Sequence, residues 1–184
     1  MLSDLRKRKL TQLFRLWDTN GDGFIEQSDY SLVAFRVAEL SGATPGSLGY
    51  QTIQEGYLNN WLSLCWVMQK GKDDLISLDD YLAAQEKILK DKAAWEYEVR
   101  DHIRGLATRA DHDQDGKGTL AEFAGIACSY GLSVDMALKV AQRMDLDHDG
   151  LISIEEILCH LEDFYYSDDP SSPGNHFAGI LETA

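Results

Sequence analysis

Acidic and amide side chains alternate around a glycine in three 12-residue segments of this chain. Each segment carries such side chains at positions 1, 3 and 5, a glycine at position 6 and a carboxylate at position 12. A hard divalent ion such as Ca²⁺ takes six to eight oxygen ligands. A loop of this length supplies them from positions 1, 3, 5, 7, 9 and 12, with glycine making the sharp turn. The spacing therefore predicts three Ca²⁺-binding loops, with about three ions bound.

Two of these segments match the pattern in full. The segment DLDHDGLISIEE supplies the predicted ligands Asp145, Asp147, Asp149, the backbone carbonyl of Leu151, and Glu156. The segment DHDQDGKGTLAE supplies the predicted ligands Asp111, Asp113, Asp115, the backbone carbonyl of Lys117, and Glu122. Position 8, whose backbone pairs with the partner loop, is Ile152 in the former but Gly118 in the latter. Because glycine is a poor strand residue, we expect a looser pairing at Gly118.

The first acidic segment, DTNGDGFIEQSD, departs from the pattern at its last position. Its predicted ligands are Asp18, Asn20, Asp22, the backbone carbonyl of Phe24, and Asp29. Asp29 is one methylene shorter than the usual glutamate, so we expect monodentate or water-mediated closure. The lower coordination favours Mg²⁺, which prefers six ligands. We still expect this loop to bind an ion.

A fourth segment, QKGKDDLISLDD, is a degenerate copy. It keeps Ile76 at position 8 and Asp80 at position 12, but it begins with Gln69 and has Asp74 where the turn glycine belongs. We therefore expect no ion there. Its predicted role is structural, because Ile76 can pair with Ile25 of the first loop and leave no unpaired edge.

Apolar residues at helical spacing flank all four segments, which indicates four helix-loop-helix units. Examples are Leu10, Leu13, Phe14 and Trp17, then Tyr30, Val33, Ala34 and Val37, then Ala137, Val140, Ala141 and Met144. The predicted fold is all-α, with two pairs of units in one compact globule. The first pair spans 1–92 and the second 93–166, and 167–184 form an extension that packs on the body. The segment 41–50 predicts a break, whereas Tyr81 to His102 contains no proline or glycine and predicts a nearly continuous helix.

Composition restricts the function classes. Asp and Glu outnumber Lys and Arg by 31 to 17, a net charge of -14 that disfavours nucleic acid and anionic membranes. No apolar run approaches the roughly 18 residues of a membrane span, and the N-terminus lacks a signal-peptide stretch. Cys65, Cys128 and Cys159 have no regular spacing and are interpreted as buried thiols of a reducing compartment. We expect a soluble, cytoplasmic monomer.

Other residues give less specific signals. The five histidines show no metalloprotease or zinc spacing, and no nucleophile motif is present, so we predict no enzymatic activity. Trp17, Trp61, Trp66 and Trp95 are interpreted as core residues. A pocket that holds a small aromatic ligand remains the alternative.

The order of these features resembles one branch of the EF-hand superfamily. The silent second loop, the aspartate that closes the first loop, and the tail EDFYYSDDPSSPGNHFAG are similar to the sarcoplasmic calcium-binding proteins and their bacterial relative calerythrin. This resemblance implies a globule with an aromatic core that acts as a cytoplasmic Ca²⁺ and Mg²⁺ buffer, and Gly118 departs from its pattern. The related photoproteins end in a proline, whereas this chain ends in Ala184, which argues against luminescence.

Three functions follow from these predictions. The first is a buffer or transport protein that binds ions without exposing apolar surface. The second is a Ca²⁺ sensor that regulates a target protein, although only four methionines are available for the flexible groove that sensors use. The third is a small-ligand carrier of the luciferin-binding type.

Overall fold

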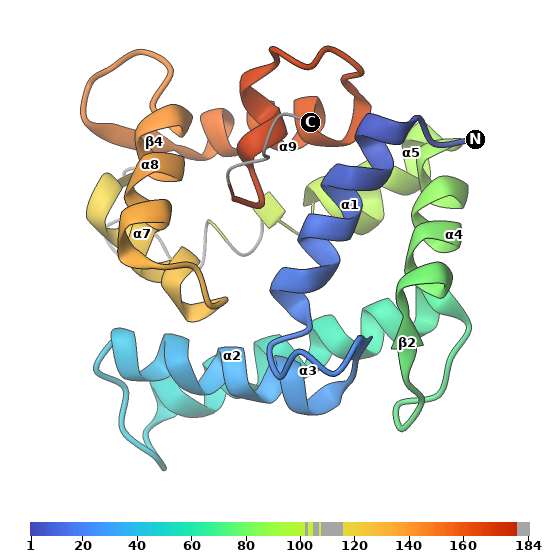
Figure 1. The fold of residues 1–184 in the computed structure, drawn as a ribbon. Helices are drawn as coiled ribbons and strands as arrows, with labels where there is room; N and C mark the ends of the chain where they lie inside the picture. The colour runs from blue at the N-terminus through green and yellow to red at the C-terminus, as the bar shows by residue number, and fades with distance from the viewer. Residues whose placement is uncertain (102, 105–106, 108–115, 180–184) are drawn as a thin grey trace.

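The computed structural model describes residues 1–101, 103–104, 107 and 116–179. Helices dominate this part of the chain, so the predicted all-α fold class is confirmed (Figure 1). The α-helices are α1 (Asp4–Trp17), α2 (Gln27–Leu40), α3 (Leu48–Met68), α4 (Leu78–Leu89), α5 (Lys92–Trp95), α7 (Leu120–Ser129), α8 (Val134–Met144) and α9 (Ile154–Tyr166). A π-helical turn, η1 (Glu96–Arg100), follows α5, and a 3₁₀ turn, η2 (Pro173–His176), follows α9.

Side-chain caps decide where two of these helices begin. The predicted break after α2 is confirmed, but α3 starts inside the expected linker because the Ser47 hydroxyl accepts a hydrogen bond from the Tyr50 amide at 3.2 Å. The stretch after Tyr81 is less continuous than predicted. Helix α4 ends at Leu89, and the Asp91 carboxylate caps a new helix by accepting from the next turn's amides at 3.1 and 3.2 Å.

Short antiparallel ladders join the loops in pairs. Strand β1 (Phe24–Ile25) pairs with β2 (Ile76–Ser77), and Ile25 lies opposite Ile76 as predicted. Strand β3 (Lys117–Thr119) pairs with β4 (Leu151–Ser153), with Gly118 opposite Ile152. The glycine therefore leaves the register of this second ladder intact.

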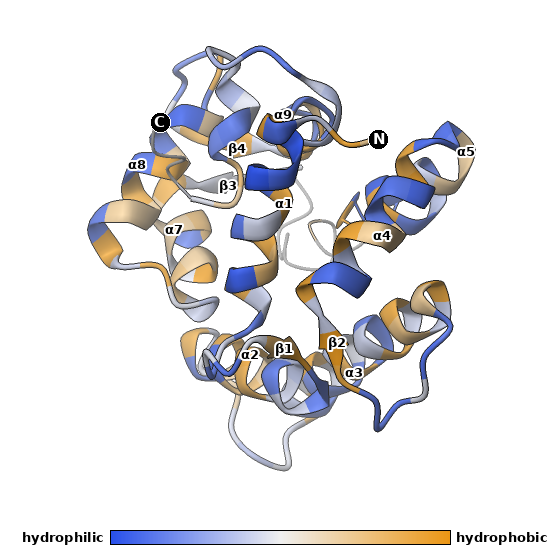
Figure 2. Ribbon diagram, turned by 45° about the vertical axis from the view of Figure 1, so that its right-hand side comes forward, coloured by the Kyte–Doolittle hydropathy of each residue, from blue (hydrophilic) through white to orange (hydrophobic). Residues whose placement is uncertain are grey.

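One hydrophobic core draws on both halves of the chain. Helix α1, which carries both hydrophobic and hydrophilic residues (Figure 2), packs against α9 and against α4 (Figure 1). The central residues of this core are fully or almost fully buried: Leu10, Phe14, Ile25, Val33, Trp61, Ile76, Trp95, Leu158, Leu161 and Phe164. A smaller core joins α7 and α8 around Val140 and Met144. The helical stripes predicted from the sequence thus supply the core residues.

Two sequence interpretations about burial are wrong. Trp66 is 80% exposed on α3, because it lies on the side of that helix opposite Trp61 and Cys65. Cys159 is exposed and Cys128 half-buried, so only Cys65 is the buried thiol that was expected.

Basic side chains of α1 hold the end of α9. Lys9 is fully buried, and its Nζ donates to the carbonyl oxygens of Ser167 at 2.8 Å and Asp163 at 3.4 Å. Arg6 donates to the Tyr166 carbonyl oxygen at 2.5 Å and to Asp168 at 2.8 Å. The last carbonyls of a helix have no partner within it and favour positive charge, which explains this arrangement.

The segment after α9 folds back onto the body. The Asp163 carboxylate accepts hydrogen bonds from the Ser172 hydroxyl and from the Gly174 amide, the latter at 2.7 Å. A Cβ at Gly174 would lie 2.5 Å from Asp163 Oδ2, so only glycine fits. Asn175 and Ala178 are buried beyond it.

Candidate metal sites

The fourth loop, residues 145–156, brings three carboxylates together. Asp145, Asp147 and Asp149 each offer an oxygen, and these oxygens lie within 4.8 Å of one another. Backbone amides fold the loop around them: the amide of Gly150 donates to Asp145 Oδ2 at 3.1 Å and that of Leu151 to Asp149 Oδ1 at 2.8 Å. Gly150 has a φ of 85°, a left-handed value that favours glycine. The arrangement suits a hard divalent cation.

Glu156 closes this loop from both ends. Its Oε1 accepts from the Leu146 amide at 2.8 Å, and its Oε2 accepts from the Ser153 amide and hydroxyl at 2.7 Å each. Ser153 in turn accepts from the Glu156 amide, which forms a capping box at the start of α9. Burial acts to raise the Glu156 pKa, but these hydrogen bonds lower it overall, so the carboxylate is readily ionised.

The first loop, residues 18–29, repeats the same contacts. The Gly23 amide donates to Asp18 Oδ2 at 2.9 Å, as Gly150 does to Asp145. Asp29 Oδ1 accepts from the Thr19 amide at 3.0 Å, and Oδ2 accepts from the Glu26 amide at 2.9 Å. These are loop positions 2 and 9, the same two positions that Glu156 holds. The shorter aspartate thus still closes the loop, because it accepts hydrogen bonds from backbone amides of that loop.

The environment of Asp29 differs from that of Glu156. Asp29 is 1% exposed, and burial raises the pKa of its carboxyl group, with hydrogen bonds from Glu26 and Thr19 partly offsetting this. The Thr19 hydroxyl adds a third bond to Asp29 at 2.8 Å. The role of Thr19 was not predicted from the sequence, because position 2 of the loop is not a ligand position.

The third loop lies largely outside the described residues, which include neither Asp111 nor Asp113 nor Asp115. Its described end is closed like the others, since Glu122 Oε2 accepts from the Thr119 amide at 2.8 Å. The side chain of Lys117 crosses to the fourth loop, where its Nζ lies 2.5 Å from Asp149 Oδ2. This contact lowers the Asp149 pKa. No local sequence signal predicts it, because it depends on the β3–β4 pairing.

The second loop, residues 69–80, has a lysine side chain among its oxygen atoms. Lys70 Nζ lies 2.9 Å from Asp80 Oδ2 and 3.4 Å from the Leu75 carbonyl oxygen. The hydrogen bond from Lys70 lowers the Asp80 pKa. Gln69 has a φ of 55° and ends α3 in the left-handed conformation, unlike Asp18 and Asp145, which begin the other described loops.

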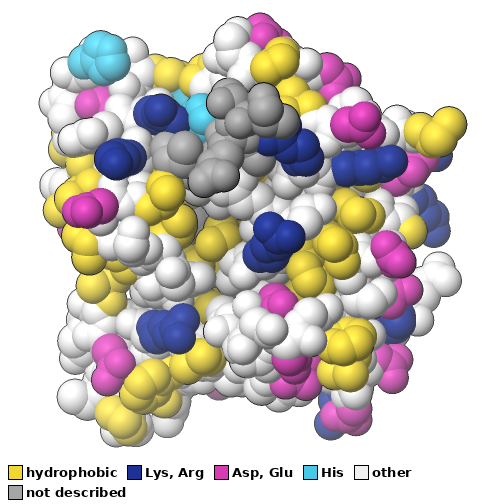
Figure 3. Space-filling view, viewed as in Figure 1, with side chains coloured by type: hydrophobic (Ala, Val, Ile, Leu, Met, Phe, Trp, Pro, Cys, Tyr) yellow, Lys and Arg dark blue, Asp and Glu magenta, His cyan; other side chains and the backbone are white. Residues whose placement is uncertain are grey.

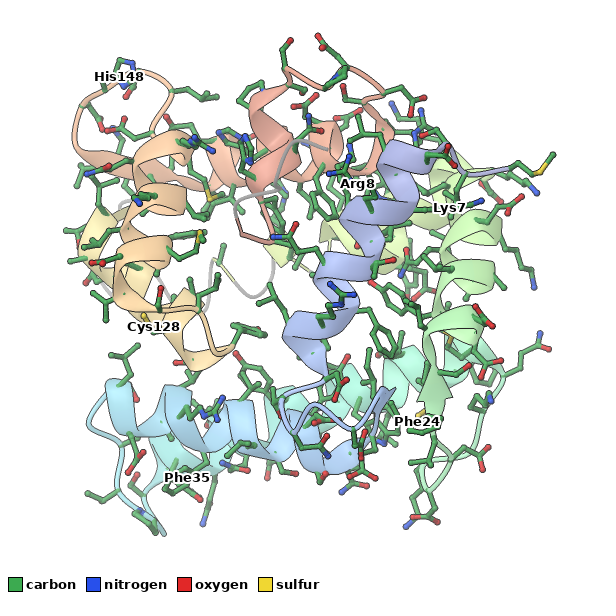
Figure 4. All side chains as sticks on the ribbon, in the orientation of Figure 1. Lys7, Arg8, Phe24, Phe35, Cys128 and His148 are labelled. Carbon is green, nitrogen blue, oxygen red and sulfur yellow. The ribbon has the colours of Figure 1, made fainter. Side chains whose placement is uncertain are left out.

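The surroundings of the loops are mixed in charge. Acidic and basic side chains are interspersed over the face that carries α1 (Figure 3). His148 stands at the tip of the fourth loop and points away from the body (Figure 4). Among the helices of the described part, none combines the length and apolar character needed to cross a membrane.

Comparison with known proteins places these loops in context. The family model described as EF hand matches residues 10–34 and 142–158, which cover the first and fourth loops. The luciferin-binding protein of Renilla reniformis is 30% identical over 182 residues, 96% of this chain and 94% of that protein. Calerythrin of Saccharopolyspora erythraea is 23% identical over 168 residues, 90% of this chain and 95% of that protein.

Solved structures give the same fold. A sarcoplasmic calcium-binding protein from amphioxus superposes with a TM-score of 0.73 at 22% identity, over 99% of this chain and all of that one. A coelenterazine-binding protein from Renilla muelleri superposes with a TM-score of 0.70 at 22% identity, over 98% of this chain and 100% of that one.

Proposed function

The chain belongs to the EF-hand family of calcium-binding proteins, with calerythrin and the sarcoplasmic calcium-binding proteins among its relatives, and from this premise we propose that it is a Ca²⁺ and Mg²⁺ buffer. Calcium binding is common to the family. The buffering role, the number of ions and the individual ligands are proposals. We further propose that the protein acts as a cytoplasmic monomer.

The proposed ligands come from three loops. Of these, the first loop is proposed to bind Mg²⁺ as well as Ca²⁺. The acidic and amide ligands are Asp18, Asn20, Asp22, Asp29, Asp111, Asp113, Asp115, Glu122, Asp145, Asp147, Asp149 and Glu156. The backbone carbonyls of Phe24, Lys117 and Leu151 complete the three sets. When bound, the ion supplies the positive charge that balances the negative charge of these carboxylates.

The observation that carries the proposal is that two loops are already closed by their last carboxylate. Asp29 and Glu156 each accept from the amides at positions 2 and 9 of their own loop. An ion that enters such a loop finds most of the backbone in place, so little reorganisation opposes binding. Binding without large rearrangement is the behaviour expected of a buffer.

The interlocked body also supports a buffer. Helix α1 contributes Leu10 and Phe14 to the same core as Phe164 of α9, and Lys9 ties the two helices together. Opening either pair of loops as a sensor does would separate buried surfaces that the two pairs share. Each buried side chain of this size stabilises the closed form by roughly 1.5–3 kcal/mol.

The experiment that tests the proposal titrates Ca²⁺ into protein held in millimolar Mg²⁺, with an added apolar dye. Calorimetry on the same samples counts the ions. Filling of about three sites with a dark dye supports the buffer. Fluorescence that rises as Ca²⁺ binds would show a groove opening and contradict it.

A sensor is the second candidate, favoured by a shallow, open and largely apolar groove between α2 and the α7–α8 pair. Leu40, Val134 and Leu138 line it and are 54%, 63% and 38% exposed. The dye titration separates this role from buffering. Variants Leu40→Ser and Val134→Ser would remove the dye response of a sensor that uses this groove.

A small-ligand carrier is the third candidate, favoured by the aromatic side chains that meet in the core. The Trp17 ring stacks on Tyr30 at 4.3 Å and meets Tyr130 edge-on at 5.0 Å. The Tyr57 and Tyr130 hydroxyls are 3.1 Å apart. Mass spectrometry of native protein after gentle purification would detect a bound organic molecule, and its absence from freshly made protein would count against this role.

A further inference from the structure

The second loop contains a positive charge supplied by the chain itself. The ammonium group of Lys70 contacts the Asp80 carboxylate at 2.9 Å and the Leu75 carbonyl oxygen at 3.4 Å. Leu75 is position 7 of this 12-residue segment and Asp80 is position 12. Ion-binding loops of this type use the same two positions for a backbone carbonyl and the closing carboxylate. Lys70 thus bridges the two groups that an ion would bridge.

We propose that Lys70 is a tethered cation that keeps the second loop closed, and that it thereby positions the first loop for its ion. The part that concerns the first loop rests on the proposed ion binding there. Lys70 contacts no ligand of the first loop, so it acts as a positioning residue.

Other contacts of the second loop agree with a closed state that needs no ion. The Ser77 hydroxyl donates to the same oxygen of Asp80 at 2.9 Å and caps α4. The Asp80 carboxylate therefore binds Lys70 and also takes part in the capping box of α4. On the opposite side of the loop, the indole nitrogen of buried Trp61 donates to the Lys72 carbonyl oxygen at 3.0 Å. The loop is therefore fixed to the core and to the start of α4.

The closed second loop is connected to the first loop through the β-ladder. Ile76 follows directly after Leu75, whose carbonyl Lys70 holds, and Ser77 caps α4. Ile76 pairs with Ile25, and Ser77 pairs with Phe24, whose carbonyl is a proposed ligand of the first loop. Anything that frees β2 also frees the backbone at Phe24. An ion that binds the first loop therefore binds beside a partner loop that is already closed.

This connection predicts an unusual sign for the effect of removing a positive charge. Loss of a lysine from an acidic protein ordinarily strengthens Ca²⁺ binding, because one repulsive charge disappears. If Lys70 positions the first loop, Lys70→Met weakens binding there instead. The Lys70–Asp80 pair is partly exposed, at 30% and 42%, so the expected loss of affinity is about two- to fivefold.

The test follows two glycine amides by NMR during a Ca²⁺ titration. Gly23 reports on the first loop through its bond to Asp18, and Gly150 reports on the fourth loop through its bond to Asp145. In Lys70→Met we expect the Gly23 midpoint to move to higher Ca²⁺ while the Gly150 midpoint stays within error.

Two matched variants complete the design. Lys72→Met removes the same charge from an exposed position of the same loop and should leave the Gly23 midpoint unchanged or move it to lower Ca²⁺. Lys70→Arg keeps a cation beside Asp80 and should restore most of the wild-type midpoint. A Lys70→Met titration that matches Lys72→Met would overturn the proposal.

A second measurement separates this inference from the ion-binding proposal. Amide hydrogen exchange of the β1–β2 ladder in chelator needs no ion, and Lys70→Met should accelerate it relative to Lys72→Met. If Gly23 does not respond to Ca²⁺ in the wild type, the proposed first site fails. The role of Lys70 in closing the second loop is then decided by exchange alone, and equal exchange in both variants would refute it.

Discussion

Replacing Lys9 with methionine measures how much its buried ammonium group costs the folded protein. The side chain is fully buried, and burial lowers the pKa of Lys9 from 10.5 to about 8, although the charge of Asp163 acts in the opposite direction. Arg6, which lies close by, also lowers it, and Asp168 raises it. Methionine keeps the unbranched apolar stem and removes only the charge and its hydrogen bonds.

The sign and size of the effect follow from these pKa values. Below pH 8 the amine is charged in both states, and the folded state carries the full desolvation cost. Between about 8 and 10.5 the unfolded chain binds more protons than the folded protein, so stability rises with pH. At about 1.4 kcal/mol for each pH unit between the two values, the total is about 3 kcal/mol. This total is a net value, because the pKa of about 8 already includes the attraction of Asp163 and Asp168, which partly offsets the desolvation.

Urea unfolding in chelator at two pH values is the assay. We expect the free energy of unfolding of wild type minus that of Lys9→Met to grow by about 2 kcal/mol from about pH 7.5 to about pH 9.5. Buried tyrosines such as Tyr57, whose pKa is raised by burial, destabilise both proteins alike at higher pH and cancel in this difference.

The control is Lys7→Met, at an exposed position of the same helix (Figure 4). Its unfolding free energy should run parallel to that of the wild type across this range. A difference between wild type and Lys9→Met that stays constant within about 0.5 kcal/mol would refute the reasoning, because the ammonium would then be as well solvated as in the unfolded chain.

Three further predictions concern the loops and the tail. Glu156→Gln should remove one ion from the calorimetric count, because a neutral amide cannot replace a carboxylate that closes the loop. Lys117→Met should raise Ca²⁺ affinity at the fourth loop several-fold at low salt and less at high salt, because the lysine competes for Asp149 at 2.5 Å. Gly174→Ala should lower the free energy of unfolding by about 1–3 kcal/mol in urea titrations, because its Cβ would overlap Asp163.

Each of these has a matched control. Glu155→Gln changes the same charge at position 11 of the fourth loop, which is an exposed side chain and not a proposed ligand, and should leave the ion count unchanged. Lys139→Met, at an exposed position of α8, should leave the fourth-loop affinity close to that of the wild type. Gly56→Ala, where a Cβ meets nothing within 4 Å, should not destabilise α3. An unchanged ion count in Glu156→Gln, an unchanged affinity in Lys117→Met or a fully stable Gly174→Ala would contradict the respective assignment.

The features that could be predicted from sequence are those set by short repeating patterns. The pairing of Ile25 with Ile76 follows from their common place at position 8 of two loops, and the structure has it. Helical stripes likewise predicted that Leu10 and Phe14 are core residues. The division into 1–92, 93–166 and 167–184 and the individual ion ligands remain predictions.

The features that could not be predicted depend on where long side chains end. Lys9, Lys70 and Lys117 each place an ammonium on oxygen atoms far along the chain or in another element. Their local sequence gives no sign of this, since most lysines are solvated. The break before α5 did have a local signal. Asp91, followed by Lys92 and two alanines, is a good helix start, but the absence of proline and glycine drew attention away from it.

The contact between α1 and the segment after α9 also has a consequence for synthesis. Arg6 and its partner Tyr166 are 160 residues apart, and at about 5–20 residues per second a ribosome needs roughly 8–30 s to add them. During this time the apolar side of α1, with Leu10 and Phe14, lacks its final neighbour. Helix α4 also packs against α1 and is synthesised much earlier than α9. In the nascent chain, α4 can therefore bury part of this apolar surface long before α9 leaves the ribosomal exit tunnel.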